Sequence, residues 1–425
     1  MKNEIEIIEN KLINNKLLKK NNKLIKKTEC GRITKKVEDV IKFLYFNIID
    51  GYLLSNKLIK NKEINIEYEF LKNKKDIKSP SNFNNHFYPE ILRLDMLNSA
   101  NFQVRCQFKI NKCLINIYII TILKKDESIE SKIEELLMNI KNMISYLNFA
   151  YRLSNCSQTL EKLTIYFYKI NKSKFLPNSQ SDILEPFHIN SAYSHVCDRN
   201  TPDLEVVLFR SEEWFKVFVH EIMHAFNLSI SNKHDSFNEI LKKIFGININ
   251  YLLSEVYAEY WARIINIAYK AYAISRNDKN GYIYKFIELL DLEREFSVLQ
   301  SSKILERYEI DLLTFTEDNN NNDIINKKLD YKEKTSVFCY YIITSFLLIG
   351  NTQMMELCYN NNPNIIDFTK NNESNIEFIN LINKIIKLKC TKKYLINFME
   401  YLNQNSSLFE KNSKNLRMSI NSWIL

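Results

Sequence analysis

Residues 214–226 read WFKVFVHEIMHAF, and this stretch decides how the rest of the chain is interpreted. Its apolar spacing favours a helix, and it places His220 and His224 four positions apart. Side chains at i and i+4 lie above one another on one helix face, so both imidazoles can reach one tetrahedral ion. Glu221 points about 100° away from that pair. It can therefore approach a metal-bound water without being a ligand, as a general base must.

The apolar flanks of this stretch make two unpaired imidazoles and a carboxylate expensive to bury, and a metal ion would compensate for that cost. The chain has 6 histidines in 425 residues. An HExxH pattern arises by chance in such a sequence roughly once in two hundred cases. The alternative is two ordinary core or surface histidines that happen to lie four positions apart.

Residues 253–263, LSEVYAEYWAR, offer a third ligand on a second predicted helix. With Glu255 facing the ion, Ala258 would lie beside it and leave room for the metal helix. Glu259 would lie one turn further along the same face, where it could accept the free N–H of a ligand histidine and fix its orientation. The alternative for Glu255 alone is a solvent-facing acid on an amphipathic helix.

HEIMH followed by SEVYAE resembles the gluzincin branch of the zincin metallopeptidases. In that branch HExxH supplies two zinc ligands and the catalytic base, and a Glu on a later helix is the third ligand. The resemblance implies that His220, His224 and Glu255 bind one Zn²⁺ and that Glu221 is the base. Glu259 stands where that pattern often has Asp, which weakens its assignment as the partner of a ligand histidine.

The hydrophobic patterns predict an α+β fold, with strands in the first half and helices almost throughout the second. Strands are expected at 64–71, 102–110, 113–123, 163–168 and 205–209, and helices at 37–58, 129–153, 212–228, 235–245, 249–275, 281–306, 335–349, 374–388 and 391–403. The order resembles zincins, with a mixed sheet, a backing helix at 129–153 and an edge strand at 205–209 before the metal helix. In zincins such an edge strand binds extended substrate backbone, by β-augmentation.

Charge and pattern divide the chain into four expected parts. A basic arm at 1–36 precedes an α/β segment at 37–100, a zincin-like lobe with the metal helix at 101–230, and a helical lobe at 231–425. The arm holds eleven Lys and Arg against four Glu, a net +7 of the chain's +9. Such an arm could touch nucleic acid, but a solvated Lys-rich helix or a tail outside the catalytic fold is the favoured interpretation.

Composition excludes several classes of protein. The 5 glycines are widely scattered, so phosphate loops and dinucleotide fingerprints are excluded and no nucleotide is expected. The 8 cysteines show no CxxC and are interpreted as reduced buried thiols. The most apolar run, at 337–350, is too short to span a bilayer, and charges at the amino terminus argue against a signal peptide. We expect an intracellular protein, cytoplasmic or virion-associated.

Other candidates are weighed against simpler explanations. Tyr340 and Tyr341, on the late apolar helix, are candidates for stabilising an oxyanion, since donors aimed at developing charge lower the barrier. His188 and His195 lie in the loop expected at 171–204 and could approach the cleft, but structural or surface histidines are commoner. Cys197 is interpreted as a plain loop cysteine rather than a reactive thiol. Arg417 could clamp a substrate carboxylate, and a surface salt bridge is the alternative.

These patterns predict a zinc-dependent metallopeptidase, in which Glu221 assists the attack of zinc-bound water on a peptide bond of a protein or peptide substrate. Two alternatives stay open: a decayed zincin-fold structural or virion-associated binding protein, and a zinc hydrolase of a non-peptide amide. The segments HINSAYS (188–194), LFRSEEWFKVFVHEIMH (208–224) and NLRMSI (415–420) are also similar to metallopeptidase-like proteins of large DNA viruses.

Overall fold

The computed structural model describes most of the chain, namely residue 12 and residues 15–179, 181–197, 202–230, 235–275, 278–317, 322–405 and 414–421. These residues form two compact units. The sheet unit consists of 43–173 and 190–228. The helical unit consists of the described residues of 1–42, together with 174–189 and 229–421.

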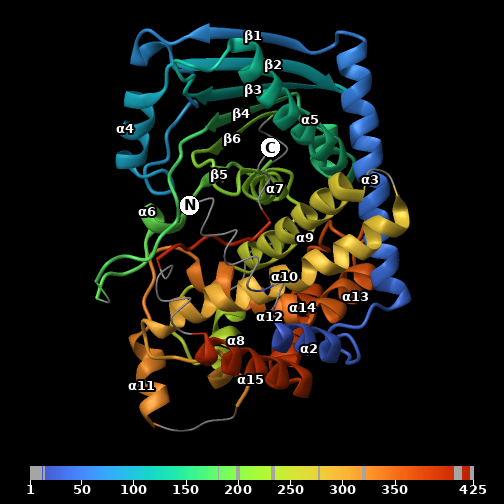
Figure 1. Ribbon diagram of the computed structural model, residues 1–425, viewed down its shortest axis with the longest axis vertical. Helices are drawn as coiled ribbons and strands as arrows, with labels where there is room; N and C mark the ends of the chain where they lie inside the picture. Colours follow the sequence, from blue (N-terminus) through green and yellow to red (C-terminus); the bar gives the residue numbers. More distant parts are fainter. Residues whose placement is uncertain are drawn as a thin grey trace. The chain divides into compact units, whose positions relative to one another are not determined.

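A six-stranded mixed sheet forms the sheet unit, in the order β1-β2-β3-β4-β6-β5 that Figure 1 shows. Its strands are β1 (Asn65–Phe70), β2 (Phe102–Ile110), β3 (Cys113–Thr121), β4 (Lys162–Tyr168), β5 (Ala192–Ser194) and β6 (Asp203–Leu208). Strands β1 to β3 are antiparallel, β3, β4 and β6 run parallel, and β5 is antiparallel to β6. A short turn with Asn111 at φ 52° joins β2 to β3, a conformation that Asn tolerates better than most residues.

The helices of the sheet unit are the later part of α3 (Lys35–Lys60), α4 (Glu90–Ser99), α5 (Ile129–Leu153) and α7 (Trp214–Ala225), with short 3₁₀ turns at η1 (Lys74–Asp76) and η2 (Asn155–Gln158). Helix α5 connects the parallel strands β3 and β4, as a crossover helix must. It packs against α7, and α3 crosses it closely at Gly51. A Cβ at Gly51 would come within 2.7 Å of the Ser145 Cα, so this crossing requires glycine.

The helical unit is built around α9 and α10, which pack against each other along their lengths. Its helices are α2 (Lys16–Ile25), the short α6 (Pro186–Ile189), α8 (Asp235–Phe245), α9 (Leu253–Ser275), α10 (Lys279–Glu306), η3 (Leu312–Phe315), α11 (Asn322–Asp330), the π-helix η4 (Phe338–Ile343), α12 (Thr344–Ile349), α13 (Asn351–Asn361), α14 (Asn372–Lys387) and α15 (Lys389–Gln404).

The α+β class and the change from sheet to helices are confirmed, while several elements differ from the prediction. The helix expected at 335–349 contains a π-helix at Phe338–Ile343, where the backbone hydrogen bonds join residues five apart instead of four. The loop expected at 171–204 contains α6 and strand β5. Strand β6 is therefore not at the sheet edge, which β5 forms among the described strands. Three helices were also missed, namely α4, α11 and α13.

Part of the expected basic arm belongs to the helical unit instead of lying outside it. Helix α2 packs against α15, and Leu18 is fully buried. The Asn22 amide donates a hydrogen bond of 2.7 Å to Glu295 on α10. Lys26 forms an ion pair with Asp291. The apolar positions of this Lys-rich segment bury against the fold while its lysines face water.

Four of the eight cysteines are paired, which differs from the expectation of reduced thiols. Cys30 is bonded to Cys390 across 360 residues, with Cα atoms 6.3 Å apart. Cys156 is bonded to Cys197, with Cα atoms 6.2 Å apart. Both separations are usual for a disulfide. Sequence spacing gave no sign of either bond, because each joins elements that only the fold brings together. The other cysteines, Cys106, Cys113, Cys339 and Cys358, are buried free thiols.

Among the described residues, none of the helices has both the length and the apolar character needed to cross a bilayer.

Glu295 makes the stability of the helical unit depend on pH. Burial raises its pKa to about 8, against an ordinary value of 4.5. The folded state therefore holds a proton that the unfolded state has lost, and the free energy of unfolding should fall as the pH rises from about 5 to about 8. The contribution of Glu295 to the slope is at most about 1.4 kcal/mol per pH unit. Chemical denaturation at several pH values would measure it.

The Glu295→Gln variant should lose the Glu295 share of this slope, because an amide has no proton to release; Glu333, whose pKa burial also raises to about 8, keeps its own share. Glu288→Gln is the matched control on the same helix, where the side chain is half exposed beside Lys285. An unchanged slope in Glu295→Gln would contradict the assignment.

The Cys30–Cys390 bond should stabilise the oxidised protein, because it closes a loop of most of the chain in the unfolded state. We expect Cys30→Ala to lower the free energy of unfolding by about 2–5 kcal/mol. Peptide mapping without reductant should recover the linked pair. The difference between the variant and the parent should shrink when both are measured in reductant; an equal difference in both conditions would argue against the bond.

Candidate metal centre

The two histidines of HEIMH lie one turn apart on α7, as their spacing predicts. Their Nε2 atoms are 3.1 Å apart. His220 is buried and His224 is half-buried. Ligand atoms placed about 2.0–2.1 Å from a tetrahedral zinc ion are about 3.4 Å from each other. The histidine pair therefore presents two nitrogens at a spacing that suits one ion.

Apolar contacts fix the position of α7 in the sheet unit. Helix α7 packs against β5, β6 and α5. Phe215 and Phe218 contact the ring of Tyr146 on α5 edge-on. Trp214 stacks on Phe167 of β4, with ring centroids 5.6 Å apart. Because these large side chains pack α7 against α5 and β4, its polar side chains have a fixed direction.

Glu221 lies in the same helix with only 8% of its surface exposed. The Ser194 hydroxyl, at the end of β5, donates a hydrogen bond of 2.8 Å to Glu221 Oε2. An ionised carboxylate only accepts hydrogen bonds, so Ser194 must be the donor. Ser194 was not singled out from the sequence, and no local pattern could have found it.

Glu255, in the first turn of α9, joins the two histidines as a candidate ligand. One ligand atom from each of His220, His224 and Glu255 lies within 4.8 Å of the others. Two imidazole nitrogens and one carboxylate oxygen are the donors of one class of catalytic zinc site with three protein ligands. The residues fit the metal that the sequence predicts, and this group could hold a metal ion.

Glu259 forms a buried ion pair one turn further along α9. Its Oε1 accepts a hydrogen bond of 2.8 Å from Arg263 Nε, and both side chains are at most 1% exposed. Arg263 also donates to the Ser297 hydroxyl on α10 and to the Tyr340 carbonyl. Glu259 thus helps, through Arg263, to hold α9 against α10 and the π-helix. The hydrogen bond that it was expected to accept from a ligand histidine stays a prediction. Arg263 was not singled out from the sequence.

The two tyrosines proposed for the oxyanion have different surroundings. The hydroxyl of Tyr341 is buried and donates to the Leu416 carbonyl. This hydroxyl is therefore already used in a hydrogen bond to the C-terminal segment. Tyr341 is no longer a candidate for stabilising an oxyanion. Tyr340 is half-buried on the π-helix, and its role stays a prediction.

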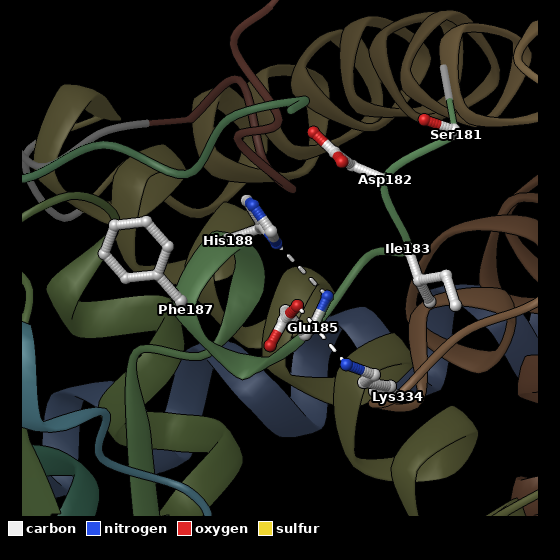
Figure 2. A pocket seen from close by; sticks show the side chains of 7 residues that line it. All are labelled: Ser181, Asp182, Ile183, Glu185, Phe187, His188 and Lys334. Atoms are coloured by element: carbon white, nitrogen blue, oxygen red, sulfur yellow. Dashed lines mark hydrogen bonds and ion pairs between the residues drawn. The ribbon is translucent and has the colours of Figure 1, made fainter. Parts of the chain in front are cut away.

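The remaining candidates have structural contacts. His188 packs against Phe175 and accepts a hydrogen bond of 3.2 Å from the Glu185 amide. It lines a cavity of about 630 Å³ that Figure 2 shows, whose other lining residues are Ser181, Asp182, Ile183, Glu185, Phe187 and Lys334. His195 is exposed. Arg417 is buried and donates to the Ser419 carbonyl, so it is not a surface residue.

Comparison with known proteins gives one distant relative. The chain is 26% identical over 385 residues to a protein of Acanthamoeba polyphaga mimivirus named "Uncharacterized protein R210". The match covers 85% of this chain and 93% of that protein. No family model matches the chain. No solved structure matches it either. The chain is thus distantly similar to a viral protein whose name assigns no activity.

Arg263→Leu should destabilise the helical unit strongly, because it leaves the Glu259 carboxylate buried without its cation. Removing one partner of a buried pair costs about 3–5 kcal/mol. Replacing both residues, as in Glu259→Leu with Arg263→Leu, should recover part of the loss. Urea unfolding of the metal-free protein measures both. A loss below about 0.5 kcal/mol in the single variant would show that the pair contributes nothing to the fold.

Proposed function

We propose that the protein is a zinc-dependent metallopeptidase of the zincin type, in which His220, His224 and Glu255 hold one zinc ion. The observation that carries the proposal is the grouping of two imidazole nitrogens and one carboxylate oxygen within 4.8 Å. The mixed sheet with the helix α7 beside it is consistent with that class. So is the half-buried state of His224, because catalytic zinc sites keep one position open to water or substrate.

Glu221 is the proposed general base. When bound, zinc acts as a Lewis acid and lowers the pKa of a coordinated water to near 7. Glu221 would take a proton from the attacking water on its carboxylate and give that proton to the leaving amine. Its near-complete burial supports this role, because a carboxylate shielded from bulk water keeps the proton within the site.

An extended peptide is the proposed substrate. Strand β5 forms one edge of the sheet, and it precedes α7 in the chain. The outer edge of a strand can bind a peptide by adding it as another strand, with main-chain hydrogen bonds. Ala192 and Tyr193 of β5 are buried, so Ser194, which is half-buried, is the residue of this strand that a peptide reaches first. A substrate bound this way would run along β5, whose last residue, Ser194, contacts Glu221.

The proposal includes an intracellular setting, cytoplasmic or virion-associated, without a nucleotide cofactor. Two other functions share the same donor set. A zinc hydrolase of a non-peptide amide would use the same ligands and base, and a decayed zincin-fold binding protein would hold metal without turnover. A mixed peptide library incubated with the zinc-loaded protein, with and without chelator, separates these cases by mass spectrometry. Chelator-sensitive cleavage of peptide bonds supports the peptidase; no cleavage of any peptide contradicts it.

Substitutions in the metal centre should distinguish the residues that bind zinc from the residue that acts as the general base. His220→Ala, His224→Ala and Glu255→Ala each remove a coordinating atom, so bound zinc should fall steeply in all three. Glu221→Gln keeps its shape but cannot accept a proton. It should hold zinc like the parent while hydrolysis falls by about two to four orders of magnitude. Metal analysis of the purified proteins and a peptide cleavage assay measure the two effects.

Glu288→Ala is the control for the loss of an acidic side chain, since it lies on the helical unit with a half-exposed carboxylate. It should keep both zinc and activity. Full zinc content in Glu255→Ala, combined with its loss in Glu259→Ala, would move the third ligand by one helical turn. Full zinc content in both variants would contradict the gluzincin assignment.

A further inference from the structure

The backbone of β5 alternates between groups that bond β6 and groups that face the sheet edge. The Ser191 carbonyl accepts a hydrogen bond of 2.8 Å from the Phe209 amide, and the His195 amide donates one of 3.3 Å to the Glu205 carbonyl. In an antiparallel ladder the residues between such positions turn their N–H and C=O away from the partner strand. Ser194, paired with Val206, is one of these residues. Its backbone groups therefore face the outer edge of the sheet.

The side chain of the same residue reaches the proposed base. Ser194 Oγ lies 2.8 Å from Glu221 Oε2, an ordinary distance for a hydroxyl hydrogen bond, which the charge of the carboxylate strengthens. Ser194 is half-buried and Glu221 is buried. One residue thus connects the sheet edge, through its backbone, with the carboxylate on α7, through its hydroxyl.

Contacts on both sides of Ser194 anchor the segment that carries it, while the backbone groups of Ser194 itself face away from β6. The preceding residues are held in the ladder with β6. Further along, the Cys197 amide donates a hydrogen bond of 2.9 Å to the Ala225 carbonyl at the end of α7. Cys197 is also bonded to Cys156. The segment from β5 to Cys197 therefore runs beside α7 with its two ends anchored, and Ser194 lies between the anchors.

We propose that Ser194 is a positioning residue, which couples occupation of the β5 edge by an extended peptide to the orientation of the Glu221 carboxylate. This inference rests on the proposed function. A peptide strand that bonds the N–H and C=O of Ser194 restricts the backbone from which the hydroxyl projects. The hydroxyl then holds Oε2 of Glu221 more firmly, so the carboxylate is oriented when a peptide long enough to cover β5 is bound.

Substrate length provides a readout that a merely structural role would not change. In the parent we expect kcat to rise as the peptide is extended along β5, since remote binding then orients the base. In Ser194→Ala this rise should disappear, with kcat on long peptides lowered by about tenfold and KM changed by less than about threefold. A structural defect would lower the rate on short and long peptides alike. Zinc content should equal that of the parent.

Two further variants protect the test against a folding defect. Ser194→Thr keeps a hydroxyl donor, and Ser194→Val has nearly the same shape without it; both are β-branched and suit a strand. Thr should restore the length dependence and Val should not. Ser211→Ala is the control, because it removes another serine hydrogen bond of the sheet unit, to the Ile170 carbonyl, outside the site. It should leave the length dependence unchanged.

A measurement without turnover tests the contact itself. In metal-free protein, the melting-temperature shifts of Ser194→Ala and Glu221→Ala should not add in the double variant. The sum of the single shifts should exceed the shift of the double variant by about 2–4 °C. Additive shifts would overturn the contact and with it the proposal.

The outcomes separate the two proposals. If Ser194→Ala and Ser194→Val keep the parent's length dependence while Glu221→Gln abolishes cleavage, the role of Ser194 is wrong and the peptidase stands. If the zinc-loaded parent cleaves no peptide, the peptidase is wrong and the coupling role of Ser194 falls with it, whatever the melting temperatures show about the contact.

Discussion

The structure depends on placing a polar face on a helix that is otherwise surrounded by apolar side chains. Helix α7 is held by Trp214, Phe215 and Phe218, and it carries two imidazoles and a carboxylate into that environment. Burying such groups is costly unless each finds a partner. Ser194 supplies one partner to Glu221, and the donor set of His220 and His224 suits a metal ion. The same packing that makes these groups expensive also fixes their directions, which is what a preorganised site requires.

In the helical unit, helix α9 also buries polar side chains, and they form a stripe along one of its faces. Glu255, Glu259, Arg263 and Asn266 recur at three- and four-residue spacing, which is the period of one helix face. Arg263 joins Glu259 to α10 and to the π-helix η4, and Asn266 donates to the Asn421 carbonyl. Glu293 on α10 accepts hydrogen bonds from Ser419 and Asn421. The C-terminal segment is therefore part of what holds α9 in place.

The π-helix η4 packs against both α9 and α10. It presents the Tyr340 carbonyl to Arg263 and the Tyr341 carbonyl to Ser301 on α10. A π-turn leaves carbonyls out of the regular helical ladder, and such turns are frequent at functional sites. Here the Tyr340 carbonyl accepts from the buried Arg263 guanidinium, and the Tyr341 carbonyl accepts from the Ser301 hydroxyl, which also bonds the Ser297 carbonyl. The π-helix thus contributes to the surroundings of α9, whether or not the Tyr340 hydroxyl meets substrate.

Much of the architecture and the candidate site could be predicted from the sequence, for local reasons. The spacing of His220 and His224 and the helical period of the second half follow from backbone geometry, which is the same in any protein. The alternating apolar residues of β2 and β3 likewise predict a hairpin. Errors arose where local pattern is weak, as in the three residues of β5, or where a charged composition hides buried apolar positions, as in α2.

By itself, the sequence determined the ligand spacing on α7, the acidic face of α9 and the order of sheet and helices. Only the tertiary structure decided which side chains support them. Ser194 meets Glu221 across 27 residues, and Cys30 meets Cys390 across 360. No period in the sequence encodes these pairs, because each depends on how separate elements pack rather than on the geometry of one element. Tyr341 lost its proposed role for the same reason, since its partner is the backbone of Leu416, a residue brought to it by the folded chain.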